Sequence, residues 1–199
     1  ETISTPVVTF KSGAVAITDT SITYVNTSGN IWTAAYTVNA NDTSGAVTFS
    51  VAFSDTAATG PNAGTAVTSA TGSVTASLDT TAPTMAITSA EVSDGDTSND
   101  GTLSLKFTSS EATSNFAVGD ITVSGGTLSS FAATSSTVYT ATFTPSAGGA
   151  TTIDVAAGAF TDAASNNNTA ATQFNWTYDS IHPSLSRPTG ECRARASPN

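Results

Sequence analysis

Thr-Leu-Ser-Leu-Lys-Phe-Thr-Ser at residues 102–109 is the stretch that decides the fold. Its apolar residues occupy every second position, so Leu103, Leu105 and Phe107 point to one side and polar residues point to the other. A period of two is typical of a β-strand with one buried face. Residues 139–144 repeat the alternation, and no window carries the 3.6-residue apolar stripe of an amphipathic helix. The sequence therefore predicts an all-β fold.

Strands of this kind recur through the C-terminal half, separated by clusters of Gly, Asn, Asp and Ser that mark turns. We expect seven strands, near residues 84–89, 102–109, 120–124, 127–133, 137–144, 151–156 and 171–178. Seven short strands in about 100 residues are typical of an antiparallel β-sandwich of immunoglobulin type. Trp32 and Trp176 alternate with polar residues in the same way, and we expect both to be anchors of a core.

The chain contains two segments with the same order of features: an aromatic strand, an aliphatic strand, a Phe-Ser/Thr-Asp turn and an Asp-x-x-x-Pro exit. The two exits begin at Asp79 and Asp179, which lie 179 − 79 = 100 residues apart. That spacing gives the length of one repeat. The sequence predicts tandem immunoglobulin-like sandwiches, with one repeat at 1–80 and a complete repeat at 81–181.

The two ends of the chain depart from the repeat. When the repeats are aligned, Glu1 falls opposite Glu111, so the first repeat is expected to be truncated and to lack its first two strands. Residues 182–199 are rich in Arg and lose the alternation. We expect this segment to be disordered or to be the start of a further repeat.

Several motifs together resemble a known family. They are Asp-Thr-Thr-Ala-Pro at 79–83, Phe-Thr-Ser-Ser-Glu at 107–111, Gly-Asp-Ile-Thr-Val at 119–123 and Ala-Ala-Gly-Ala-Phe-Thr-Asp-Ala-Ala at 156–164. In these motifs the chain resembles the tandem bacterial Ig-like repeats of large secreted and surface adhesin-type proteins. The family usually has Asp-x-Ala-Gly-Asn where this chain has Asp-Ala-Ala-Ser-Asn at 162–166. The resemblance implies an extracellular or cell-surface location and a role in adhesion or matrix formation, with calcium often stiffening the rod.

Composition excludes several functions. Of the 15 acidic residues, 14 lie in 1–182, where Lys11 and Lys106 are the basic residues. Phosphate binding needs clustered Lys and Arg, so we expect no nucleic-acid partner. No run of about 18 apolar residues is present, so we expect no membrane insertion. One His and one Cys cannot build a zinc site of the usual composition, and we expect the chain not to be an enzyme.

An up-and-down path through the sandwich places the acidic loops at two poles. One pole, near the linker between the repeats, is expected to gather Asp79, Glu111, Asp162, Asn166 and Asn168. The opposite pole is expected to gather Asp94, Asp96, Asp100 and Asp179. Calcium prefers such hard oxygen ligands, so both poles are candidate calcium sites. The alternative stays open that these are ordinary turn residues, because Asp and Asn side chains bond to local backbone.

These observations predict a non-catalytic structural or adhesive repeat of a long extracellular or cell-surface protein. It would act as a rod-like spacer, stiffened by calcium at the linkers and packed against neighbouring Ig-like repeats of the same or adjacent chains. Two alternatives stay open. One is a module that binds a glycan or ice through exposed threonine rows such as Thr140, Thr142 and Thr144. The other is a filament subunit whose first repeat is completed by strand donation.

Overall fold

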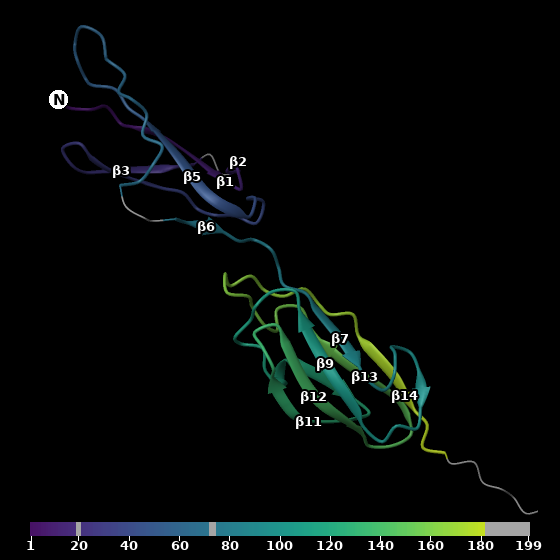
Figure 1. Cartoon of the computed structure of the whole chain (residues 1–199). Helices are drawn as coiled ribbons and strands as arrows, with labels where there is room; N and C mark the ends of the chain where they lie inside the picture. The colour runs from purple at the N-terminus through teal and green to yellow at the C-terminus, as the bar shows by residue number, and fades with distance from the viewer. Residues whose placement is uncertain (19–20, 72–74, 182–199) are drawn as a thin grey trace, which may run out of the picture.

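The structure is a computed structural model that describes residues 1–18, 21–71 and 75–181. The described residues form two elongated β lobes that lie end to end, joined by a short linker at residues 79–83 (Figure 1). The expectation for residues 182–199 falls outside the described residues. No helix in the described part of the chain has the length and hydrophobicity needed to cross a membrane.

The C-terminal lobe consists of two four-stranded sheets. The first has the order β11 (Gly126–Ala133), β12 (Val138–Pro145), β9 (Leu103–Ser109), β7 (Met85–Ser89), with antiparallel pairing throughout. The second has the order β10 (Ile121–Ser124), β13 (Gly149–Val155), β14 (Phe174–Tyr178), β8 (Thr97–Ser98), and a short 3-10 helix, η1 (Val118–Asp120), precedes β10. The seven expected strands are present, β8 is an additional short one, and the immunoglobulin-like sandwich is confirmed for this lobe.

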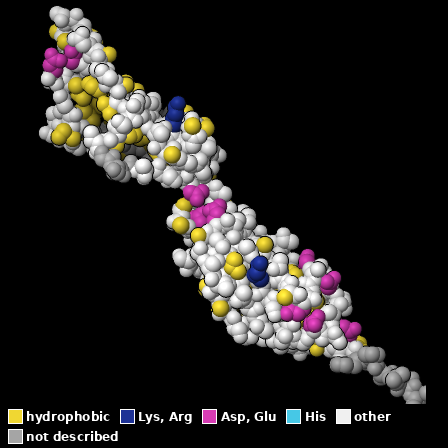
Figure 2. Space-filling view, in the orientation of Figure 1, with side chains coloured by type: hydrophobic (Ala, Val, Ile, Leu, Met, Phe, Trp, Pro, Cys, Tyr) yellow, Lys and Arg dark blue, Asp and Glu magenta, His cyan; other side chains and the backbone are white. Residues whose placement is uncertain are grey.

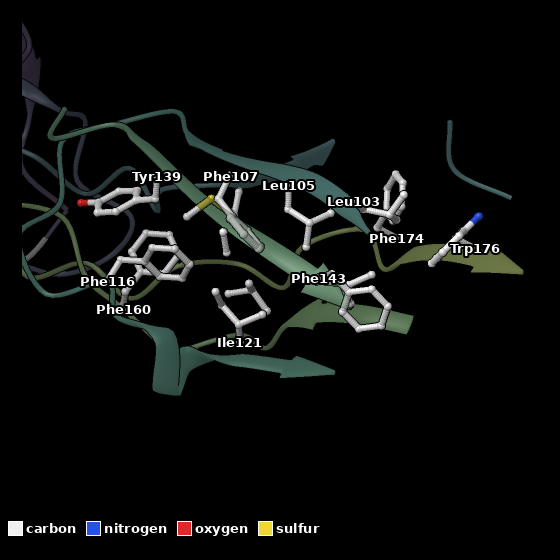
Figure 3. Close-up of a cluster of buried hydrophobic side chains, with 14 residues drawn as sticks. Leu103, Leu105, Phe107, Phe116, Ile121, Tyr139, Phe143, Phe160, Phe174 and Trp176 are labelled. Atoms are coloured by element: carbon white, nitrogen blue, oxygen red, sulfur yellow. The ribbon is translucent and has the colours of Figure 1, made fainter. Parts of the chain in front are cut away.

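The core of this lobe lies between the two sheets and is built by the alternation seen in the sequence. Leu103, Leu105 and Phe107 of β9 are at most 1% exposed. Phe143 and Trp176 come from facing sheets and pack edge to face, with ring centroids 6.3 Å apart (Figure 3). Each such fully buried side chain contributes roughly 1.5–3 kcal/mol. Trp176 is therefore the core anchor that its sequence context predicts.

The N-terminal lobe has the same plan with fewer strands. Its larger sheet has the order β2 (Val15–Ala16), β1 (Val7–Ser12), β5 (Gly45–Ala52), β6 (Ser77–Leu78), so β1-β5-β6 corresponds to β10-β13-β14. A separate hairpin of β3 (Thr23–Ser28) and β4 (Ile31–Ala35) corresponds to β11 and β12. In the described part of this lobe, no strand occupies the place of β9 or β7.

Trp32 lies in a more open environment than its counterpart in the second lobe, because no described strand of the first lobe takes the place of β9 or β7. The side chain is only half-buried and lies in an open groove, and in the described part of this lobe the buried apolar residues are Pro6 and Val8. The expectation that Trp32 anchors a closed core is therefore wrong for this structure. Its counterpart in the alignment, Tyr139, is 4% exposed because β9 and the facing sheet cover the core around it.

Candidate metal centre at the linker

Three carboxylates meet between the two lobes. Asp79 begins the linker directly after β6, Glu111 follows the end of β9 by two residues, and Asp162 lies in the loop after β13. One oxygen from each of the three carboxylates lies within 4.8 Å of the other two. Figure 2 shows this acidic patch at the waist of the molecule. The topology brings together the three acidic residues that the sequence assigns to the linker pole.

Asp162 is fixed by the turn that it starts. Its Oδ1 accepts the backbone N–H of Asn166 at 2.9 Å, and its Oδ2 accepts the side-chain Nδ2–H of Asn166 at 2.8 Å. Burial acts to raise the pKa of Asp162, but these hydrogen bonds, together with those from the Ala164 backbone and the Glu111 side chain, hold it below its ordinary value. Asp162 is therefore an oriented carboxylate that stays ionised.

Glu111 has the opposite electrostatics. Burial raises the pKa of Glu111, and the negative charges of Asp79 and Asp162 raise it further. The charges that act on Glu111 from this cluster are both of its own sign. A hydrogen bond between the Glu111 and Asp162 carboxyl groups favours a proton on Glu111. A bound cation would remove the repulsion and take the place of that proton.

Hydrogen bonds from both lobes hold the linker. On the first-lobe side, Ser44 Oγ accepts the Thr80 N–H at 2.9 Å, and the Thr80 hydroxyl donates to the Asp42 carbonyl at 3.0 Å. On the second-lobe side, Asn166 Nδ2–H donates to the Asp79 carbonyl at 3.1 Å. Farther along, Thr169 N–H donates to the Pro83 carbonyl at 3.0 Å. The position of Asp79 is therefore set by contacts with both lobes.

The two asparagines expected at this pole differ in role. Asn166 lies at the cluster and links the Asp162 carboxylate to the linker backbone. Asn168 is 3% exposed, and its amide is fully used inside the loop. Its Oδ1 accepts the Phe160 N–H at 2.9 Å, and its Nδ2–H groups donate to the Ala156 and Thr169 carbonyls at 2.8 Å each. Asn168 therefore stabilises the loop, and both its Oδ1 and its Nδ2 bond to backbone groups of that loop instead of facing the carboxylates.

The acidic residues of the opposite pole do not converge in the same way. Among the described residues, the three-carboxylate group is confined to the linker. The four acids at the far pole instead accept hydrogen bonds of 2.7–2.9 Å. Asp96, Asp100 and Asp179 accept them from groups two or three residues away, which are the Ser93 N–H, the Ser98 hydroxyl and the Ile181 N–H. These three bonds are typical of turn residues, whereas Asp94 accepts the N–H of Asn175 and so joins its loop to β14.

The threonine row on β12 lies in the outer face of the first sheet. Thr142 pairs with Ser104 on one side and Ser129 on the other. Thr140 pairs with Lys106, whose charged side chain interrupts the polar row. No feature of this face favours glycan or ice binding over an ordinary solvated sheet.

The linker cluster fits a calcium ion by the chemistry of its donors. Calcium takes about six to eight oxygen ligands and accepts carboxylates in one- or two-oxygen coordination. Asp79, Glu111 and Asp162 supply up to six such oxygens. The cluster contains neither His nor Cys, the ligands that zinc favours. Sequence reasoning missed Ser44 and Thr80, which tie the linker to the first lobe, because Ser and Thr are too frequent here for single positions to stand out.

The family model described as bacterial Ig-like domain matches residues 79–178. The matched segment begins at Asp79, the first residue of the linker, and ends at Tyr178, the last residue of β14. Searches of curated proteins and of solved structures return no significant match.

Proposed function

This chain belongs to the family of bacterial Ig-like domains, and from that premise we propose that it is a rod-forming spacer of a long extracellular or cell-surface protein. Bacterial Ig-like domains are generally non-catalytic structural modules and typically lie at the cell surface. The spacer would carry an adhesive or matrix-forming part away from the cell, with neighbouring Ig-like repeats as its partners. The observation that carries this proposal is the joint between the lobes.

The joint has the properties that a rod needs. The lobes lie end to end, and the linker between them is five residues long (79–83) (Figure 1). Pro83 restricts the residue before it to extended conformations, and its own side chain is buried. Each of the two lobes also forms hydrogen bonds with the linker. A linker held in this way limits bending, which favours an extended array over a flexible chain.

We propose that calcium binds Asp79, Glu111 and Asp162 and completes this joint. The ion would join the linker to two loops of the second lobe, because Glu111 and Asp162 come from opposite sheets of that sandwich. It would also remove the repulsion that raises the pKa of Glu111. Without a cation, three carboxylates whose oxygens lie within 4.8 Å of one another repel each other at the joint.

Thermal unfolding in calcium and in chelator tests the ion. A ligand at 100 times its Kd stabilises the folded state by about 2.7 kcal/mol. For a domain of this size, about 4–8 °C per kcal/mol gives a rise in Tm of at least about 10 °C. We expect this rise in the parent chain and its loss in Asp79→Asn and Asp162→Asn. Asp96→Asn, at the far pole, is the matched control and should keep it.

Distance measurements between the lobes test the rod. Spin labels at Thr9→Cys and Thr127→Cys, with Cys192→Ser, place one probe on an exposed site of each lobe. Calcium should narrow the distribution of label-to-label distances without shortening its mean. A broad distribution that calcium leaves unchanged would contradict the stiffened joint.

In the thermal-unfolding test, no change in Tm at millimolar calcium would show that the three acids are turn residues.

A further inference from the structure

The first lobe carries a second copy of the aspartate–asparagine pair that contacts the linker. Asp55 Oδ1 accepts the backbone N–H of Asn62 at 2.9 Å, and Asp55 Oδ2 accepts the side-chain Nδ2–H of Asn62 at 3.0 Å. Asp162 accepts the same two groups from Asn166, at 2.9 Å and 2.8 Å. In both pairs the aspartate N–H donates to the asparagine carbonyl, at 3.0 Å in the first lobe and 3.2 Å in the second. We call each such pair a clasp.

The two clasps occupy corresponding places in their lobes. An isolated antiparallel bridge encloses each of them, between Ser54 and Ala63 in the first lobe and between Thr161 and Asn167 in the second. These residues come directly before each aspartate and directly after each asparagine. The asparagine lies seven positions after the aspartate in the first lobe but four positions after it in the second. The sequence therefore hides a correspondence that the hydrogen bonds reveal.

The clasp of the second lobe shows what such a pair binds. Besides its bond to Asp162, the side-chain amide of Asn166 donates to the Asp79 carbonyl of the linker at 3.1 Å. The Asn62 amide also has two N–H groups, and Asp55 is its side-chain partner among the described residues. Asn62 is exposed, and Figure 1 shows the loop after β5 at the end of the first lobe away from the linker. Its second N–H can therefore reach a carbonyl from outside the lobe.

The second lobe ends in a segment with the geometry of the linker start. In each lobe the last residue of the last strand pairs with a glycine of positive φ, which is Gly45 (140°) or Gly149 (132°). The aspartate that follows accepts the N–H of the residue two positions later, at 3.0 Å for Asp79 and 2.9 Å for Asp179. The exit segment, residues 178–181, therefore leaves the second lobe by the same turn with which the linker leaves the first.

We propose that the clasp of Asp55 and Asn62 is a docking site for the exit segment of a second copy of this chain. Asn62 Nδ2–H donates to the carbonyl of Asp179 of the second copy, as Asn166 donates to that of Asp79 within the chain. The clasp and the exit segment lie at opposite ends of the molecule (Figure 1), so docking joins copies head to tail. A contact between two different surfaces that does not close into a ring extends the array.

A second copy is the occupant that these features identify. The chain carries both halves of a contact that it already makes once, between the linker and the second lobe. Asp79 and Thr80 are half-buried in that joint, whereas Asp179 and Ser180 are exposed. The exit segment thus presents the surface that the linker covers. This inference rests on the spacer function proposed above, and it adds the surfaces through which two spacers join.

Sedimentation velocity of the full chain tests the contact. The chain carries Cys192→Ser, which prevents disulfide-linked copies, and excess chelator makes the result independent of calcium. The weight-average sedimentation coefficient should rise between about 10 µM and 1 mM, the range of a small, weak interface. Asn62→Ala removes the donor and Asp179→Ala removes the acceptor that sets the exit turn. Each should weaken association at least about tenfold, whereas the controls Asn167→Ala and Asp96→Asn should associate like the parent.

A mixture of the two variants separates docking from misfolding. Asn62→Ala retains the exit segment, and Asp179→Ala retains the clasp. Equal amounts of the two should therefore form a one-to-one dimer and no longer species, although each variant alone stays monomeric at the same concentration. A variant that had failed to fold could not restore the contact in this way.

Three results would overturn the docking site. A parent chain that stays monomeric up to about 1 mM would show that the clasp does not bind the exit segment. Association that persists unchanged in both variants would assign the contact to another surface. A mixture that stays monomeric while the parent associates would show that the clasp and the exit segment do not meet. The spacer function is tested separately, by the Tm and distance measurements on the joint within one chain.

Discussion

The substitution Asn168→Ala distinguishes two possible roles of Asn168, which are to stabilise its loop by hydrogen bonds and to bind calcium as a ligand. The substitution removes three hydrogen bonds of 2.8–2.9 Å, to the Phe160 N–H and to the Ala156 and Thr169 carbonyls. Each neutral hydrogen bond contributes about 1 kcal/mol, and a buried N–H left without a partner adds about 1–3 kcal/mol. We therefore expect a loss of about 4–6 kcal/mol from the C-terminal lobe. At about 4 °C per kcal/mol this lowers Tm by about 16–24 °C.

The assay is thermal unfolding in excess chelator and then in millimolar calcium. The loss in chelator should be as large as the loss in calcium, because the three hydrogen bonds do not involve an ion. Asn167→Ala is the control on the adjacent exposed residue and should change the free energy of unfolding by less than about 0.5 kcal/mol. If Asn168→Ala unfolds like the parent in chelator but no longer responds to calcium, Asn168 is a ligand and the reasoning fails.

Three other outcomes are expected. Because the pKa of Glu111 is raised, the group contributes stability to the calcium-free lobe at low pH and loses it as pH rises through that pKa. Calcium affinity should therefore fall as pH is lowered, because the ion must displace the proton on Glu111. Titration calorimetry in two buffers of different ionisation enthalpy should detect that released proton, and Glu111→Gln should abolish the release. Ser44→Ala, which removes the acceptor of Thr80 N–H, should leave the calcium-dependent rise in Tm intact but broaden the distribution of distances between spin labels on the two lobes. Gly126→Ala brings a methyl group against the Phe143 ring and the Thr144 carbonyl and should cost about 1–3 kcal/mol by denaturant unfolding, whereas Gly119→Ala, in open space, should not.

The C-terminal lobe was predictable because its strands follow a simple rule. One face of each strand is buried, so a period of two in the sequence maps directly onto the core. Leu103, Leu105 and Phe107 illustrate this, with exposures of 0%, 1% and 0%. The same rule misplaced Trp32, because alternation identifies the face that a side chain takes but not whether another strand covers it. Whether a side chain is buried depends on the strand that packs over it as much as on the alternation of apolar residues in its own strand.

The candidate site was predictable only in part. Loop order along an up-and-down sandwich is enough to bring Asp79, Glu111 and Asp162 to one end. It cannot decide between Asn166 and Asn168, which lie in the same loop. Their roles depend on which way each amide points: Asn166 toward the carboxylates, Asn168 into the loop backbone. That difference is set by local hydrogen bonds, and composition carries no trace of it.

The arrangement of the joint also limits what calcium can do there. Two of the three carboxylates belong to the second lobe and the third to the linker, so an ion at this place fixes the linker to the second lobe. The first lobe is connected to the linker by the hydrogen bonds that Ser44 and Asp42 form with Thr80. The proposed rod is therefore stiff only if the linker is fixed to the first lobe and also to the second lobe, and the weaker of these two connections determines how far the rod bends. In the proposed rod, a bound calcium ion would raise the stability of the second lobe, but it would stiffen the rod only while the hydrogen bonds between the linker and the first lobe hold.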